Sequence, residues 1–188
     1  MSQRRVAITG LGLISPYGGD LPDFFTRLLA SESAVHFLRT DDIPRPLTIP
    51  FVSCPNFDVD GVLGRPLAST MDRFAQLGTA AAFAAWADAG LTRGQPAEDR
   101  ENWGVAWGTA LGGTLAYEKG YRELWQKGRE RVSPLSVILG MNNAANAHIS
   151  IQLGLGGVSM SHTVACASSA IAIGEAFRRV RSGEAPVM

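Results

Sequence analysis

Apolar and polar positions along the chain predict strands and helices that alternate. Short apolar runs bounded by glycine or polar residues predict buried strands at Val6–Leu13, Asn102–Thr109 and 157–164. Longer stretches with apolar residues three or four positions apart predict helices at Leu21–Ala30, Asp72–Ala89, Thr114–Gln126, Asn142–Leu153 and 167–182. Strands that alternate with helices indicate an α/β fold with a mostly parallel sheet.

The least regular part of the chain is 31–70. Prolines at positions 44, 46, 50, 55 and 66 interrupt any long element there, so a single strand is expected at Thr48–Ser53. Turn residues also mark helix ends elsewhere. Gly90 suits the end of the helix that begins at Asp72, and Ser133-Pro134 suits the start of another helix.

The charge balance and composition exclude several classes of protein. The 188 residues carry 17 Lys and Arg against 17 Asp and Glu, and no basic run predicts contact with nucleic acid. No stretch of about eighteen apolar residues predicts a membrane span. The N-terminal apolar run is too short for a secretory signal, so we expect a cytoplasmic protein. The 2 cysteines and 3 histidines show no metal-ligand spacing, and no metal site is expected.

Cys166 is the strongest candidate for chemistry. It lies where the strand predicted at 157–164 gives way to the helix predicted at 167–182. The first turn of a helix has unpaired N–H groups and the positive end of the helix dipole, which favour a thiolate nucleophile. Most free cysteines are instead small buried core residues, and the local sequence leaves both interpretations open.

A glycine-rich turn follows the first predicted strand, as it would in a dinucleotide-binding motif. Gly10 and Gly12 fit such a motif, but Ser15 stands at the third glycine position and Pro16 interrupts the expected helix. We therefore predict no nicotinamide site here.

Five segments together resemble the N-terminal half of the β-ketoacyl synthases, the condensing enzymes of fatty-acid and type II polyketide synthesis. The segments are RRVAITGLGLISPYG at 4–18, MDRFAQLGTAAAFAAWADAGL at 71–91, GVAWGTALGG at 104–113, RVSPLSVILGMNNAANAHISIQLGLGG at 131–157 and VACASSA at 164–170. Each is weak alone, whereas their order and spacing make the match specific. The resemblance implies a thiolase-like fold with α-β-α-β-α layers in the full enzyme.

The resemblance also implies roles for single residues. Cys166 would be the nucleophile that accepts an acyl group from acyl carrier protein, with its backbone N–H in the oxyanion hole. The small residues Ala165, Ala167 and Ser168 would let substrate approach the thiol, and Leu111 would line the acyl pocket. The substrate would arrive on the phosphopantetheine of the carrier protein, so no bound cofactor is expected.

The resemblance makes 1–188 an N-terminal synthase domain that is expected to be truncated. The family's two catalytic histidines and its lysine belong to a C-terminal half, and Glu184–Met188 reads as the start of a strand. The expected partners are acyl carrier protein, that C-terminal half, and a second subunit in a homodimer or heterodimer. The expected reaction is decarboxylative condensation of the acyl group on Cys166 with malonyl-acyl carrier protein. A non-catalytic condensing-enzyme-like partner, such as a chain-length-factor-type interaction subunit, is the alternative.

Overall fold

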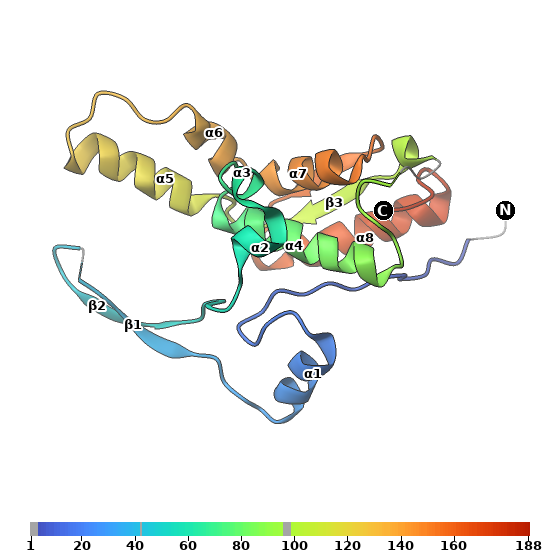
Figure 1. Cartoon of the computed structure of the whole chain (residues 1–188), viewed down its shortest axis with the longest axis horizontal. Coiled ribbons are helices and arrows are strands. Elements are labelled where there is room, and N and C mark those ends of the chain that lie inside the picture. The colour runs from blue at the N-terminus through green and yellow to red at the C-terminus, as the bar shows by residue number, and fades with distance from the viewer. Residues whose placement is uncertain (1–3, 42, 96–98) are drawn as a thin grey trace.

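The computed structural model of the chain describes residues 4–41, 43–95 and 99–188 (Figure 1). Two strands and three long helices form its centre, while a β-hairpin and a helical arm extend away from it (Figure 1). The central elements are α4 (Arg73–Asp88), β3 (Val105–Gly108), α7 (Ala144–Leu153), β4 (Ser159–His162) and α8 (Ser168–Ser182). Each lies within a segment whose pattern predicts it.

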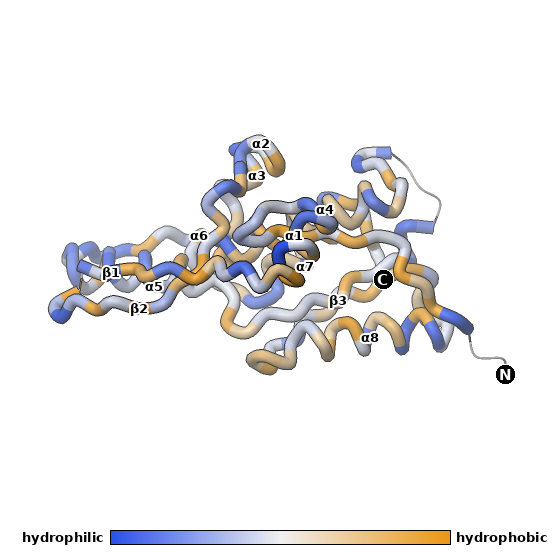
Figure 2. Tube along the Cα trace, turned by 90° about the horizontal axis from the view of Figure 1, so that it is seen from below, coloured by the Kyte–Doolittle hydropathy of each residue, from blue (hydrophilic) through white to orange (hydrophobic). Residues whose placement is uncertain are grey.

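A parallel strand pair forms the middle layer of the centre. Val105 of β3 lies opposite Ser159 of β4, and Gly108 lies opposite His162. α7 and α8 both contact these strands, and α4 packs on α7. Figure 2 shows α4 and α8 on opposite sides of β3, so the layers are helix, sheet and helix. The predicted α/β class with a parallel sheet is confirmed.

The small side chains of α4 explain why this helix can lie at the centre. Ala75 and Thr79 are fully buried, and a Cβ atom at Gly78 would overlap the indole ring of Trp107. Small residues let neighbouring elements approach closely, and large side chains then fill the remaining space. The buried apolar core contains Leu63, Ala68, Met71, Ala75, Ala80, Phe83, Trp86, Val105, Ala145, Ile149 and Leu153.

The strand predicted at Val6–Leu13 is wrong: this segment has no strand pairing and lies along α4. A Cβ atom at Gly12 would overlap the carbonyl oxygen of Ala81, and the Leu11 N–H donates a hydrogen bond of 2.8 Å to Asp88 Oδ2. An apolar run becomes a strand only when another strand pairs with it, and no described strand lies beside this one. The glycines allow the close approach to the helix instead.

The strand start predicted at Glu184–Met188 is also not formed. The Gly104 N–H donates a 3.0 Å hydrogen bond to the Val187 carbonyl, just before β3 begins. No strand ladder extends from this bond in the described part of the chain. The edge of β3 that faces away from β4 therefore has one backbone hydrogen bond to this segment, whereas a paired strand would form several.

Region 31–70 contains more structure than its prolines predict. β1 (His36–Thr40) and β2 (Leu47–Phe51) form an antiparallel hairpin in which both strands are largely exposed. β2 agrees with the predicted strand, whereas β1 and the short helices α2 (Val59–Leu63) and α3 (Arg65–Ala68) were not predicted. The predicted first helix is confirmed as α1 (Leu21–Leu29), which Asp20 caps through the Asp23 N–H.

The helical arm consists of two antiparallel segments. α5 (Thr114–Tyr121) continues into a π-helical turn (Arg122–Gln126), and α6 (Leu135–Gly140) returns beside it. Both helices were predicted, and the Ser133 hydroxyl accepts a hydrogen bond from the Leu135 N–H at the start of α6. A single turn of 3₁₀ helix at Arg100–Asn102 precedes β3.

Candidate functional site

Cys166 lies in a tight turn between β4 and α8. The turn is a 3₁₀ segment, Ala165–Ala167, followed directly by the first residue of α8. Ala165 has a φ of 50°, a left-handed conformation that is strained for a residue with a side chain. The cysteine is exposed, so the turn presents its thiol at the surface at the N-terminal end of α8. The interpretation of Cys166 as a buried core residue is therefore wrong.

The start of α8 lies beside this thiol. α8 has no side-chain cap, and its first N–H, that of Ser168, donates to the Ala165 carbonyl within the turn. The helix dipole adds positive potential at the same end. A negative charge that forms on sulfur or on an attacked carbonyl oxygen would be stabilised there.

Ala165 and Ala167 flank Cys166 and are exposed, as small residues beside an accessible thiol would be. Ser168 differs, since only 2% of its surface is exposed. Its hydroxyl lies 2.9 Å from the Val164 nitrogen, 2.7 Å from the Ala165 carbonyl oxygen and 3.1 Å from the Thr109 carbonyl oxygen. Direct contact between Ser168 and a substrate remains a prediction, and its hydrogen bonds are all internal to the turn and the adjoining strand end.

Leu111 lies in the loop that leaves β3 at the same end of the sheet. The Thr109 N–H donates a 3.1 Å hydrogen bond to the His162 carbonyl, which holds this loop beside the end of β4. Leu111 is 72% exposed, and a Cβ atom at the neighbouring Gly113 would overlap the Leu139 carbonyl of α6. Because the carboxyl ends of parallel strands share one edge, the sheet brings the loops of Leu111 and Cys166 together.

The three histidines lie on other structural elements, and no histidine of the described residues is hydrogen-bonded to Cys166. The His36 ring meets Phe51 edge-on with centroids 5.5 Å apart, and a His148 ring nitrogen lies 3.2 Å from the Thr70 carbonyl oxygen. His162 of β4 is half-buried and near Glu175. The hydrogen bond from Arg178 lowers the pKa of Glu175, and the charge of His162 acts in the same direction.

One buried carboxylate was not predicted from the sequence. Asp72, 7% exposed at the start of α4, accepts a 2.6 Å hydrogen bond from the Ala116 N–H in the first turn of α5. It caps a helix whose own N-cap residue, Gly113, has no side chain. The contact joins residues 44 positions apart, and no local motif signals it. Asp72 therefore fixes the helical arm to the centre.

An open cavity beside β3 lies away from the cysteine. It has a volume of ≈ 510 Å³ between α4, the N-terminal segment and β3, and neither Leu111 nor Cys166 lines it. Gly10, Ala85, Trp103 and Trp107 are among its lining residues. Within the described ranges no group of acidic, histidine or cysteine side chains could hold a metal ion. No described helix is long and apolar enough to cross a bilayer.

Comparison with known proteins places this geometry in a family. The family model for the β-ketoacyl synthase N-terminal domain matches residues 3–188. Among curated relatives, 3-oxoacyl-[acyl-carrier-protein] synthase 2 of Staphylococcus aureus (strain COL) is 34% identical over 194 residues, and the Vibrio cholerae protein of the same name is 33% identical over 192. Each alignment covers 100% of this chain and 45% of the relative.

Solved structures show the same fold. A β-ketoacyl synthase from Burkholderia phymatum is 25% identical with a TM-score of 0.78, over 96% of this chain and 44% of that one. The ishigamide ketosynthase/chain length factor is 26% identical with a TM-score of 0.83, over 98% of this chain and 46% of that one. The chain thus spans less than half the length of these relatives. Its match over 3–188 and its thiolase-like fold show that it belongs to the β-ketoacyl synthase family.

Proposed function

We propose that this chain carries the nucleophile of a β-ketoacyl-[acyl-carrier-protein] synthase, and that the nucleophile is Cys166. The observation that carries the proposal is the exposed thiol in a strained turn at the uncapped start of α8. Family membership supports it, as do the curated relatives, whose names give the same reaction class. A structural cysteine would gain nothing from this exposed and strained position.

The first half-reaction is transfer of an acyl group. The thiolate of Cys166 attacks the carbonyl carbon of an acyl thioester on acyl carrier protein. A new bond to the cysteine sulfur forms, the bond to the carrier's sulfur breaks, and the carrier leaves as a thiolate that takes up a proton. The backbone N–H of Cys166, at the start of the helix, is placed to stabilise the oxyanion. Since one thioester replaces another, the site has only to lower the barrier.

The second half-reaction makes the carbon–carbon bond. A malonyl thioester loses carbon dioxide, and the resulting carbanion attacks the acyl carbon held on Cys166. The carbon–sulfur bond to the cysteine breaks, and the product is a β-ketoacyl thioester two carbons longer. We assign the decarboxylating groups to a C-terminal half, because the hydrogen bonds of His36 and His148 go to other residues and His162 Nε2 has no hydrogen bond to the thiol. The cycle uses no bound cofactor.

We propose three partners for this domain. Acyl carrier protein would deliver the acyl group to Cys166, and Leu111 would line the acyl pocket beside it. A C-terminal half would complete the active site, and a second subunit would complete a homodimer or heterodimer. Exposed apolar side chains on the hairpin and the helical arm support the last two, since an isolated domain seldom leaves so many uncovered.

Intact mass spectrometry with acyl-loaded carrier protein tests this proposal. We expect the chain to gain the mass of one acyl group, Cys54→Ala to gain the same mass, and Cys166→Ala to gain none. A short acyl thioester of pantetheine, supplied in excess, removes the need for carrier docking. An adduct that persists in Cys166→Ala would contradict the assignment of the nucleophile. If the chain together with a C-terminal half were unreactive to both donors, the result would favour the non-catalytic, chain-length-factor-type alternative.

A further inference from the structure

The hydroxyl of Ser168 is placed to hold the cysteine turn in its strained shape. Ser168 is the first residue of α8, and its side chain points back into the turn that precedes it. It accepts a hydrogen bond from the Val164 N–H, on the strand side of Cys166. The hydroxyl can donate a hydrogen bond to the Ala165 carbonyl at 2.7 Å or to the Thr109 carbonyl at 3.1 Å. One buried oxygen thus bonds both residues that precede the thiol.

These bonds act on the strained residue itself. The left-handed φ of 50° at Ala165 is unfavourable for alanine, so other contacts must hold the turn in place. The backbone supplies two bonds within the turn, from the Ala167 N–H to the Val164 carbonyl at 3.2 Å and from the Ser168 N–H to the Ala165 carbonyl. Ser168 adds bonds on both sides of the strained φ of Ala165. Its hydroxyl accepts from the Val164 N–H before this dihedral and can donate to the Ala165 carbonyl after it.

Ser168 also connects the turn to the loop that carries Leu111. Its contact with the Thr109 carbonyl crosses from α8 to the end of β3. The backbones pack closely here, since a Cβ atom at Gly108 would lie 2.6 Å from the Ser169 nitrogen. A side chain without a hydroxyl would leave the Val164 N–H without this acceptor and the Thr109 carbonyl without this donor.

We infer that Ser168 is a positioning residue for Cys166: its buried hydroxyl holds the Val164–Ala165 backbone so that the thiol stays at the N-terminal end of α8. The inference rests on the proposed function only in one respect, namely that acyl transfer requires the thiol at this position. The effect on the thiol itself follows from the hydrogen bonds. Ser168 therefore acts on the thiol through the backbone of the turn. This role does not depend on the small size of the side chain, which the resemblance links to substrate access.

The first test compares alkylation of the two cysteines by iodoacetamide in Ser168→Ala and in the wild-type chain. We expect the rate constant at Cys166 to fall about tenfold, as for a misplaced reactive group, while the rate constant at Cys54 stays unchanged. Peptide mass spectrometry resolves the two sites. A purely structural role would lower the fraction of folded protein, and unfolding would raise the rate constant at Cys54, which is partly buried in the fold.

Two further variants complete the design. Ser182→Ala removes a hydroxyl that donates to the Arg179 carbonyl at the far end of α8, and it should leave both rate constants unchanged. Ser168→Thr keeps the hydroxyl and should restore at least half of the lost rate. If Ser168→Thr fails to fold, saturation kinetics of acylation of Ser168→Ala by acyl-pantetheine replace it. The maximal rate should then fall while the half-saturating concentration stays constant.

The outcomes separate this inference from the proposed function. An unchanged alkylation rate at Cys166 in Ser168→Ala would overturn the positioning role and leave the nucleophile assignment intact. Faster alkylation of Cys54 in Ser168→Ala would also overturn it, because it would show general unfolding. A wild-type chain that is alkylated rapidly but is never acylated, even with a C-terminal half present, would contradict the proposed function alone, and the Ser168 comparison would still stand.

Discussion

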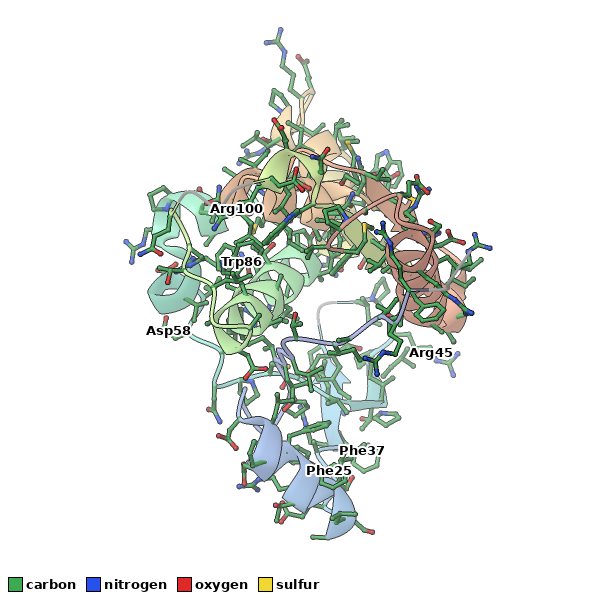
Figure 3. All side chains as sticks on the ribbon, turned by 90° about the vertical axis from the view of Figure 1, so that its right-hand side faces the viewer. Phe25, Phe37, Arg45, Asp58, Trp86 and Arg100 are labelled. Carbon is green, nitrogen blue, oxygen red and sulfur yellow. The ribbon has the colours of Figure 1, made fainter. Side chains whose placement is uncertain are left out.

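The centre of the molecule and its two projections are stabilised in different ways. In the centre, Trp86 is 8% exposed, packs against Trp103 with ring centroids 5.7 Å apart, and lies under the Arg100 guanidinium. In the hairpin, Phe37 is 74% exposed and its strand is held by backbone pairing to β2. In Figure 3, Phe25 and Phe37 lie below the ribbon of α4, on the other side of the view from Trp86 and Arg100. Buried side chains hold the centre, whereas local bonds hold the projections.

The helical arm, like the hairpin, is held by contacts between residues close together in the sequence. Tyr121 and Trp125 stack face to face with centroids 4.7 Å apart, and the Trp125 side chain is nevertheless exposed. Glu123 forms ion pairs with Lys127 and Arg129 at the tip. The lesson is that a large apolar residue contributes to stability here only if it lies within reach of α4 and β3. Each prediction below changes one side of this contrast.

The largest effect is expected from truncation of a phenylalanine in the centre. Phe83→Ala should destabilise the fold by about 3–5 kcal/mol, because it leaves a cavity in the packed core. Phe37→Ala makes the same change on the exposed hairpin and should stay within about 0.5 kcal/mol. Urea unfolding monitored by circular dichroism gives both values. Equal destabilisation would mean that the hairpin is packed in solution, and the contrast would fail.

A second prediction concerns the N-terminal segment on α4. Gly12→Ala should destabilise by about 3 kcal/mol, because the added methyl group would overlap the Ala81 carbonyl. Gly174→Ala, in the middle of α8, meets nothing within 4 Å and should stabilise by up to about 1 kcal/mol through helix propensity. Thermal unfolding of the two variants should therefore move in opposite directions. Shifts of the same sign would contradict the docking of this segment.

The joint between the centre and the helical arm gives a third prediction. Asp72→Ala leaves the partly buried Ala116 N–H without its acceptor and should cost about 2 kcal/mol. Asp60→Ala removes a carboxylate from an exposed pair with Arg65 and should cost less than about 0.5 kcal/mol. Hydrogen exchange should speed up in α5 for Asp72→Ala while α8 stays protected. Uniform loss of protection in both helices would show that Asp72 supports the whole centre.

The smallest effect is a pH dependence at the arm's tip. The hydrogen bond from Lys127 lowers the pKa of Glu123, and the charges of Arg129, Lys127 and Lys119 add to it. A lowered pKa means that Glu123 stabilises the fold above its unfolded pKa and loses that contribution as the pH falls through the folded value. Order around residues 122–129, followed by NMR, should decline below about pH 4.5, the unperturbed value for Glu. Glu123→Gln should flatten this decline.

The sequence pattern predicted the central helices well, for a physical reason. Helices such as α4 and α8 satisfy their own backbone hydrogen bonds, so their periodic apolar positions are enough to specify them. The turn at Cys166 could be located because it is the boundary between one pattern and the next. The prediction of a strand at Val6–Leu13 was wrong because a strand needs another strand to pair with. The pattern of one segment does not reveal whether such a strand lies beside it.

The site depended more on contacts between distant segments. Nothing in the sequence showed that Ser168 would bond to Thr109, or that Asp72 would cap a helix 44 residues later. The small residues at 165–168 all looked alike in the sequence, and only burial separates Ser168 from Ala165 and Ala167. Such contacts follow from the arrangement of the layers, which a local pattern does not specify.

The cavity beside β3 has a practical consequence. Trp103 and Trp107 both line it, next to the edge of β3 that has one backbone contact. Indole fluorescence depends on the polarity around the ring, so any polypeptide that enters this space would change the emission of these two residues. The chain therefore carries its own optical probe for whatever completes its sheet, and the signal could be followed in real time without an attached label.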